Sequence, residues 1–209
     1  MEETLVVRVP DGPSLEARLG SVASPKGGFI LCHPHPLYGG DMDNPVVIRA
    51  AEVAQTAGYA SLRFNFRGVG ASEGAHDKGL GEQEDVRAAM GALAARLPGG
   101  APVGVIGYSF GAWTAAHTVR PSEPGVPLAL VAPPIGMYDW GFLQAGSGGL
   151  LLVAGSRDSY CPVEAFHRVA AAAGGEAHVV EGADHFFFGK LYPLGELIGA
   201  WLARAPAGG

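Results

Sequence analysis

Five consecutive residues, Gly107-Tyr108-Ser109-Phe110-Gly111, have the types and spacing that nucleophilic catalysis requires. An apolar run at residues 103–106 precedes them, and an alanine-rich helical pattern follows. A G-x-S-x-G at such a strand-to-helix junction is typical of a nucleophile elbow, in which a sharp turn exposes the serine hydroxyl at the carboxyl edge of a sheet. Glycine suits the first and last positions because a Cβ there would crowd the turn. The alternative is an incidental serine, so the motif requires partners elsewhere.

Two downstream loops carry the partners that a nucleophilic serine needs. A serine hydroxyl is a weak nucleophile near neutral pH and requires an adjacent base that a third group orients. In an open α/β sheet these groups follow the carboxyl ends of strands. Asp158 follows a predicted strand at residues 150–154, and His185 follows one at residues 178–180. We therefore predict a catalytic triad of Ser109, His185 and Asp158.

Other histidines and aspartates compete for these two roles. His117 is too far along the helix after the elbow to turn back, His167 falls within a predicted helix, and His178 falls within a predicted strand. Asp184 adjoins the base, and we expect it to make a local turn hydrogen bond. Asp139 is the alternative acid, if the acid follows the preceding strand.

Acyl transfer also requires two N–H donors for the developing oxyanion. The amide of Phe110, directly after the serine, is one predicted donor. The second is expected in the loop at residues 33–40, HPHPLYGG, which follows an early strand. Prolines 34 and 36 have no N–H, so His35, Leu37 or a later residue must donate. We favour His35.

The spacing of His33 and His35 also raises the question of a metal site. Two histidines at i and i+2 could bind a metal in an extended loop with Asp41 or Asp43 nearby. Strand-like alternation sends their side chains in opposite directions, and no further residue is a convincing ligand. We therefore predict no metal; we expect His33 to be packed and bonded beneath the active site and the His35 ring to lie near its rim.

A glycine-rich segment at residues 64–74, FNFRGVGASEG, invites a phosphate-binding interpretation. Its spacing matches neither G-x-G-x-x-G nor a Walker motif, and it does not follow a first strand. A tight loop after a central strand, with Arg67 pairing locally, is the better interpretation.

Composition and charge restrict the remaining classes. At 209 residues, the chain is long enough for one domain, residues 1–209, with a sizeable core. A net charge of −6 without basic runs argues against nucleic acid or anionic membranes as partners. The two cysteines, Cys32 and Cys161, form no disulfide framework. The acidic start does not resemble a signal peptide, and no apolar run is long enough to span a membrane. We therefore expect a cytoplasmic protein.

Periodicity predicts an antiparallel start followed by alternating strands and helices. This order predicts a mostly parallel α/β sheet of eight strands with helices on both faces. Strands are expected at residues 4–9, 15–19, 29–32, 59–64, 102–106, 128–131, 150–154 and 178–180, and helices at residues 45–54, 82–97, 112–116, 162–173 and 191–203.

These motifs together resemble the α/β-hydrolase superfamily, in particular compact bacterial hydrolases related to dienelactone hydrolases and simple carboxylesterases. HPHPLYGGDMDNPVV, RFNFRGVGASEG, GYSFG, GSRDSYCP and GADHFFFGK occur in the order of that group. The resemblance implies the α/β-hydrolase fold, the triad order Ser109, Asp158, His185, oxyanion donors at Phe110 and in the HPHP loop, and no cofactor. Dienelactone hydrolases proper carry cysteine at the nucleophile position, so the serine here favours a serine esterase.

The segment between residues 131 and 150 is too short for the helical cap that many superfamily members insert, so we expect an open site without a cap domain. Hydrolysis of short-chain carboxylic esters through an acyl-enzyme is the predicted activity. The alternatives are a thioester, lactone, amide or perhydrolase reaction and a non-catalytic binding protein. The protein is expected to be a monomer or a homodimer. The predicted substrate-binding residues are Leu37, Tyr38, Tyr108, Met137, Trp140 and Phe186.

Overall fold

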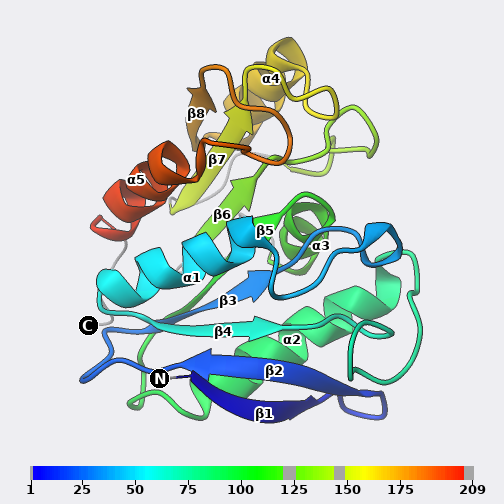
Figure 1. Cartoon of the computed structure of the whole chain (residues 1–209), viewed down its shortest axis with the longest axis vertical. Helices are drawn as coiled ribbons and strands as arrows, with labels where there is room; N and C mark the ends of the chain where they lie inside the picture. The colour runs from blue at the N-terminus through cyan, green and yellow to red at the C-terminus, as the bar shows by residue number, and fades with distance from the viewer. Residues whose placement is uncertain (1, 120–125, 144–148, 205–209) are drawn as a thin grey trace.

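The computed structural model describes residues 2–119, 126–143 and 149–204. A sheet with the strand order β1-β2-β4-β3-β5-β6-β7-β8 runs through it (Figure 1). Only β2 is antiparallel to its neighbours, whereas all other adjacent strands are parallel. The predicted mostly parallel eight-stranded sheet is therefore confirmed. Its strands are β1 (Glu2–Arg8), β2 (Ser14–Gly20), β3 (Gly28–Cys32), β4 (Ala60–Phe64), β5 (Val103–Tyr108), β6 (Leu128–Val131), β7 (Leu150–Gly155) and β8 (Glu176–Val180).

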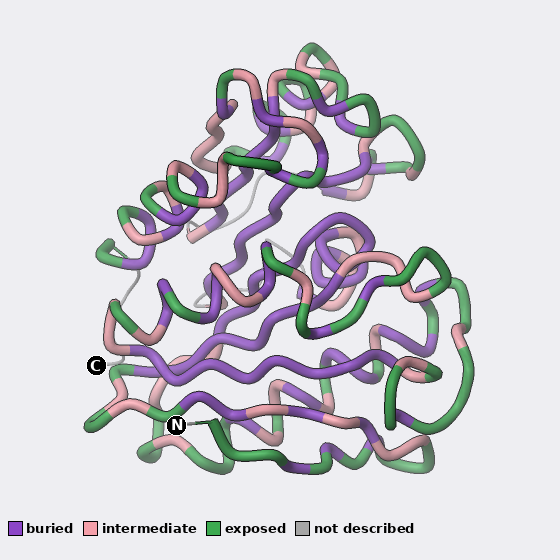
Figure 2. The backbone as a smooth tube through the Cα atoms, in the orientation of Figure 1, coloured by how far each residue is buried: buried purple, intermediate pink, exposed green. Residues whose placement is uncertain are grey.

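Helices cover both faces of the sheet. Helices α1 (Pro45–Thr56) and α5 (Leu191–Leu202) lie on one face, and α2 (Leu80–Ala94), α3 (Phe110–Thr118) and α4 (Val163–Ala173) on the other (Figure 1). Side chains of successive residues in a central strand point to opposite faces of the sheet and pack in different hydrophobic clusters. Ile30 packs with α2 and α3, whereas Leu31 packs with α1 and α5. The uniformly apolar strands of the sequence are thus buried on both sides, as Figure 2 shows for β3 and β5.

Helix α2 begins two residues before its predicted start at Glu82. Gly79 is its N-cap with a φ of 91°, and the Glu82 carboxylate accepts a hydrogen bond from the Gly79 N–H at 2.8 Å. Glu82 is therefore the third helical residue of a capping arrangement and not the first. A short 3-10 helix, η1 (Pro36–Tyr38), was not predicted, because two prolines in the loop concealed it.

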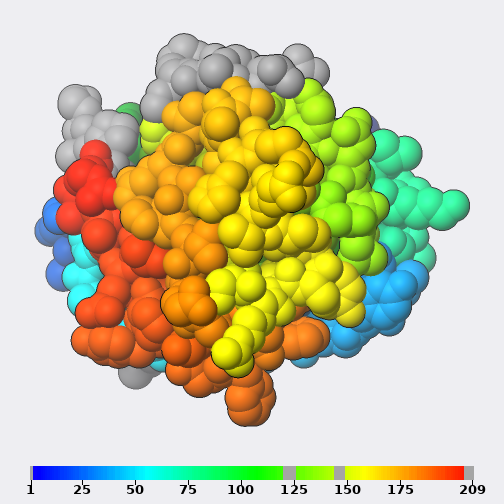
Figure 3. Space-filling model, turned by 90° about the horizontal axis from the view of Figure 1, so that it is seen from above, coloured from blue at the N-terminus to red at the C-terminus, as the bar shows by residue number. Residues whose placement is uncertain are grey.

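The carboxyl ends of the parallel strands meet at one edge of the sheet, which in Figure 1 runs from the right, at β3 and β4, to the top, at β7 and β8. Segments that are far apart in the sequence lie side by side there, which the colours of Figure 3 make visible from above. The part of the chain that the structure describes contains no separate cap domain; between β6 and β7, residues 132–143 form turns, and residues 144–148 are outside the described ranges. Within the described ranges, no helix combines the length and apolar character needed to cross a bilayer.

Candidate active site

Ser109 occupies a sharp turn between β5 and α3. Its φ of 56° and ψ of −119° place a non-glycine residue in a strained region of backbone space. A Cβ at Gly107 would collide with the Gly111 carbonyl, and one at Gly111 would collide with the Cys32 carbonyl. The two glycines therefore allow strand, turn and helix to approach closely enough for the strained serine to be held. This geometry is that of a nucleophile elbow.

Three side chains from three loops form one chain of hydrogen bonds at this edge. Ser109 Oγ lies 2.9 Å from His185 Nε2, and His185 Nδ1 lies 2.8 Å from Asp158 Oδ2. The residues are 8%, 8% and 5% exposed, respectively, so the chain of bonds is nearly closed to bulk water but open at the serine. The geometry matches that of a base beside a nucleophile and an acid that fixes the imidazole tautomer.

The loop after β7 fixes the Asp158 carboxylate. While Oδ2 faces His185, Oδ1 accepts hydrogen bonds from the N–H groups of Tyr160 at 2.8 Å and Cys161 at 3.1 Å. These donors hold one oxygen in the loop and leave the other for the imidazole. The Cys161 thiol is fully buried, and burial raises its pKa to about 12, so it is no nucleophile at neutral pH.

The loop after β8 fixes His185 from both sides. Asp184 Oδ1 accepts the N–H groups of Phe186 and Phe188, each at 3.1 Å, which is the turn role expected for this aspartate. The Tyr108 hydroxyl donates to the His185 carbonyl oxygen at 3.1 Å. Burial, together with the charges of Asp158 and Asp184, raises the pKa of Tyr108, so it remains a neutral donor.

The competing residues lie elsewhere. Asp139 accepts the Gly141 N–H at 2.9 Å and does not contact His185. His117 stacks on Phe142 with ring centroids 3.7 Å apart. His178 Nε2 lies 2.7 Å from a Glu176 carboxylate oxygen at the end of the sheet. His167 lies on α4, as the sequence predicted.

The start of α3 and the loop after β3 each contribute one candidate oxyanion donor, the N–H groups of Phe110 and His35, whose residues line one cavity with Ser109. Among the described residues, neither the Phe110 nor the His35 N–H has a hydrogen-bond acceptor. The Leu37 N–H, in contrast, donates to the His35 Nδ1 at 3.2 Å, and the Tyr38 N–H donates to the His35 carbonyl oxygen at 3.0 Å. Of the N–H groups of His35, Leu37 and Tyr38, only that of His35 has no acceptor among the described residues. Phe110 opens α3, where the helix dipole also favours negative charge.

The ring of His33 supports this loop from beneath. It is fully buried, its Nδ1 lies 2.6 Å from the Pro34 carbonyl oxygen, and its Nε2 accepts the Phe66 N–H at 3.0 Å. An imidazole that donates through Nδ1 and accepts through Nε2 is neutral. Burial lowers its pKa to about 4. His33 is thus the packed and bonded residue that the sequence predicted.

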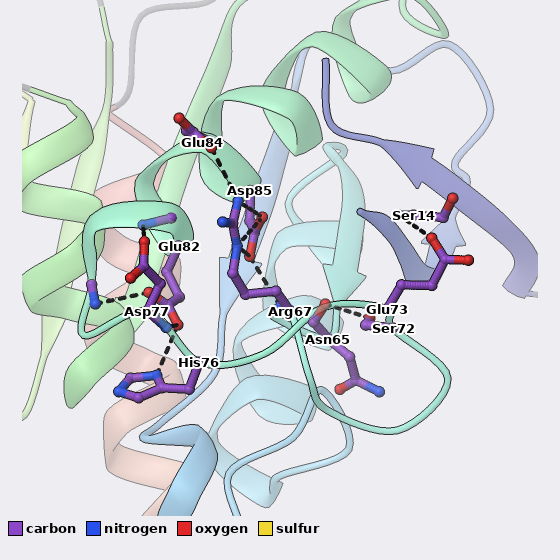
Figure 4. A network of polar contacts seen from close by, with 12 residues as sticks. Ser14, Asn65, Arg67, Ser72, Glu73, His76, Asp77, Glu82, Glu84 and Asp85 are labelled. Atoms are coloured by element: carbon purple, nitrogen blue, oxygen red, sulfur yellow. Dashed lines mark hydrogen bonds and ion pairs between the residues drawn. The ribbon is translucent and has the colours of Figure 1, made fainter. Parts of the chain in front are cut away.

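A buried polar network lies beside the loop at residues 33–40, on the side of α2. Glu82 is fully buried; its oxygens accept the N–H groups of Asp77 at 2.9 Å and Gly79 at 2.8 Å, and one lies 2.8 Å from His76 Nδ1 (Figure 4). The His76 ring in turn lies 4.8 Å from that of His35. Sequence reasoning missed both His76 and Glu82. The capping spacing from Gly79 could have identified Glu82, but nothing in the sequence indicates that His76 reaches the loop.

The glycine-rich segment after β4 is held by an ion pair. Arg67 Nε and Nη2 bond to the buried Asp85 at 3.0 Å and 2.8 Å, and Arg67 Nη2 also contacts Glu84 at 3.2 Å (Figure 4). The predicted local pairing of Arg67 is therefore present.

A cavity of about 400 Å³ opens beside Ser109; we call it the Ser109 cavity. Of the predicted substrate-binding residues, Tyr38, Tyr108, Met137 and Phe186 line it, together with both predicted oxyanion residues, His35 and Phe110. The sequence missed Asn44 and Tyr160, which also line it; no local pattern marks either of them.

Two predicted substrate-binding residues do not line the Ser109 cavity. Trp140 is 4% exposed and packs in the core near α4, where it borders a separate hollow with Leu143 and Val169. The prediction for Trp140 is therefore wrong. An aromatic residue in a short connection can bury more apolar area against the core than at a cavity wall. Leu37 is 69% exposed, because η1 turns its side chain away from the cavity.

Comparison with known proteins places this geometry among related folds. No protein-family model matches the chain. It is 33% identical over 204 residues to the uncharacterized protein RP471 of Rickettsia prowazekii, a match that covers 92% of this chain and 85% of the relative. An alpha-beta serine hydrolase homologue from Coxiella burnetii is 34% identical, with a TM-score of 0.85 and coverage of 95% of this chain and 96% of the other. A serine hydrolase without lid from Xanthomonas campestris is 30% identical, with a TM-score of 0.87 and coverage of 97% and 94%.

Proposed function

The chain belongs to the α/β-hydrolase superfamily, and we propose that it is a serine hydrolase that cleaves small, short-chain carboxylic esters through Ser109, His185 and Asp158. The observation that carries the proposal is the continuous chain of hydrogen bonds from Ser109 Oγ through His185 to Asp158, at 2.9 Å and 2.8 Å. A buried serine in a strained turn with a bonded imidazole has the arrangement of an activated nucleophile.

In the proposed reaction, Ser109 Oγ attacks the ester carbonyl carbon while its proton passes to His185 Nε2. The carbonyl π electrons move to oxygen, and the unpartnered N–H groups of Phe110 and His35 stabilise that oxyanion. As the carbonyl re-forms, the alcohol leaves with the proton from His185. Water then repeats the cycle on the acyl-enzyme and releases the acid. Asp158 stabilises the imidazolium that forms in each half-reaction.

Two features support small esters over larger substrates. The Ser109 cavity holds about 400 Å³, which suits a small molecule. The described part of the segment after β6 has no helical element that could form a lid. We therefore expect activity on dissolved short-chain esters without activation at an oil–water interface. A p-nitrophenyl ester series of increasing chain length, compared with emulsified triglyceride, tests this expectation.

The decisive experiment labels the protein with a fluorophosphonate probe and measures p-nitrophenyl ester hydrolysis. We expect wild type to react with both, and Ser109→Ala to lose labelling and at least about 10³-fold in kcat. Ser21→Ala, an exposed serine before β3, is the matched control and should behave as wild type. Unchanged ester hydrolysis in Ser109→Ala would refute the mechanism. A wild type that neither labels nor hydrolyses would favour a non-catalytic binding protein, and a panel of thioester, lactone and amide substrates separates the remaining reactions.

A further inference from the structure

The walls of the Ser109 cavity are uncharged and largely aromatic. Among the described residues, no Lys, Arg, Asp or Glu lines it. Tyrosine and phenylalanine rings, such as Tyr38, Tyr138, Tyr160 and Phe186, form most of the surface around the serine. From this lining we infer that the site takes esters without a negative charge and rejects esters whose acyl or alcohol group carries a carboxylate. The inference rests on the proposed ester hydrolysis and adds a substrate class to it.

Two arginines on β4 and directly after it are paired with carboxylates. Arg67, after β4, bonds to Asp85 at 2.8 Å, and Arg63, on β4, bonds to Asp43 at 2.7 Å. Arg157, in the loop that carries the acid, does not line the cavity. A substrate carboxylate would therefore find no guanidinium or ammonium partner on the described walls. An unpaired carboxylate that leaves water for a mostly apolar cavity incurs a large desolvation cost.

Three carboxylates, two of them buried, lie around the cavity. The Asp158 side chain has no exposed surface and lies directly behind His185. Asp184 precedes the base, and its charge, like that of Asp158, contributes to the raised pKa of Tyr108 on the cavity wall. On the opposite side, the fully buried Glu82 lies behind His76. Each of these charges repels a substrate anion, and low local dielectric strengthens the repulsion.

The polar groups on the walls carry no full positive charge. The Asn44 Oδ1 accepts a hydrogen bond from the Val46 N–H at 3.0 Å and so caps α1. His35 accepts the Leu37 N–H through Nδ1, so its ring is neutral in this arrangement. The faces of the aromatic rings carry the negative side of a quadrupole, which attracts cations. The expected order of turnover is thus cationic or neutral esters first and anionic esters far behind.

Three para-substituted phenyl acetates of similar size test the inference: 4-acetoxybenzoate, its methyl ester, and 4-acetoxyphenyl-trimethylammonium. The para substituent cannot reach the ester carbonyl, and each kcat/KM is normalised to the hydroxide-catalysed rate of the same compound. We expect the methyl ester and the ammonium compound to be hydrolysed at comparable normalised kcat/KM. The carboxylate compound should be on the order of 100-fold slower, as an unpaired buried charge requires.

A positive charge placed on the wall should reduce the discrimination against the carboxylate compound. Met137 lines the cavity and is 55% exposed, so Met137→Arg can be accommodated and should raise kcat/KM for the carboxylate compound by about ten-fold. Met137→Gln changes the wall without adding charge and should give no such rise. Tyr192→Arg adds the same charge on α5, outside the cavity, and should leave all three rates unchanged.

The outcomes separate this inference from the proposed function. Equal normalised hydrolysis of all three compounds by wild type, lost in Ser109→Ala, would overturn the charge selection and leave the esterase proposal intact. A rise in carboxylate turnover with Tyr192→Arg equal to that with Met137→Arg would also overturn it, because a long-range effect of net charge would then explain the result. Absence of hydrolysis of all three compounds, together with absence of labelling at Ser109, would refute the proposed function itself.

Discussion

The two sides of the site are built in different ways. On the side of β7 and β8, His185 presents its side chain to the serine and Asp158 bonds to His185 from behind. N–H groups of its own loop hold the Asp158 carboxylate, and hydrogen bonds to Asp184 brace the loop of His185. On the side of β3, the loop at residues 33–40 lines the cavity with His35 and Tyr38, and the group proposed to act on the substrate there is the backbone N–H of His35. That loop is supported from outside, by His33 beneath it and by the Glu82–His76 pair beside it.

This difference separates chemistry that resides in a residue type from chemistry that resides in the backbone. Asparagine in place of Asp158 would remove the negative charge that the imidazolium needs, whatever the loop does. The His35 N–H, in contrast, would exist for any residue except proline. Its use depends on where the loop is held, so distant residues can affect it. Three substitutions test this contrast, from the largest expected effect to the smallest.

Asp158→Asn should have the largest effect. The amide is isosteric but uncharged, so the imidazole loses its correct tautomer and the stabilisation of its charged form, and kcat should fall by about 10³- to 10⁴-fold. Asp139→Asn, the same change at the alternative acid, should leave kcat unchanged because Asp139 bonds only within its own turn among the contacts described. Steady-state kinetics and thermal unfolding of both variants provide the measurement. A large loss in Asp139→Asn instead would show that the acid has been misassigned.

Gly40→Ala should displace the loop at residues 33–40 and leave the proposed catalytic side chains in place. A Cβ at Gly40 would overlap the Pro34 carbonyl group, so the loop that carries the His35 N–H must move. Loss of one oxyanion donor costs about 10²-fold in kcat. We expect a loss of that size with the triad intact, measured as kcat with p-nitrophenyl acetate.

Gly39→Ala is the matched control for this loop. Gly39 has a φ of 78°, but a Cβ there meets nothing within 4 Å. The substitution should cost about 1 kcal/mol of stability through backbone strain and much less activity than Gly40→Ala. Equal kcat losses in the two variants would indicate that general loop strain, and not displacement of the His35 N–H, limits the rate.

Glu82→Gln should have the smallest effect on rate. It tests directly whether the loop at residues 33–40 depends on support from the Glu82–His76 pair. The N–H groups of Asp77 and Gly79 bond to different oxygens of Glu82, so glutamine keeps an acceptor for only one of them and also removes the charge beside His76. We expect a loss of about 2 kcal/mol in the free energy of unfolding. A several-fold fall in kcat with unchanged KM should accompany it, because the support of His35 weakens. Glu84→Gln, on the exposed face of the same helix, is the control and should change neither quantity substantially. A destabilised Glu82→Gln with wild-type kcat would show that the oxyanion loop is independent of this pair.

The sequence predicted the fold and the placement of the side-chain groups, for identifiable reasons. Strands that are apolar on both faces, separated by turns, indicated a parallel sheet. The residues that follow such strands lie together at the carboxyl edge of the sheet. Ser109, Asp158 and His185 could be selected because each has a distinctive residue type after a strand. The aromatic residues were harder. Trp140 and Met137 lie in the same connection between β6 and β7. Only the packing of the folded chain shows that Trp140 is part of the core and that Met137 lines the Ser109 cavity.

The sequence by itself thus determined which functional groups exist and along which edge they occur, because side-chain chemistry and hydrophobic periodicity are local properties. Only the tertiary structure shows that the Leu37 N–H already bonds to the His35 ring, whereas the His35 N–H has no acceptor among the described residues. All such groups are chemically alike, so their availability depends on which acceptors the folded chain brings to them. The same holds for the support of the loop: Glu82 and His76 belong to a segment with no catalytic motif, and folding alone brings them beside the HPHP loop.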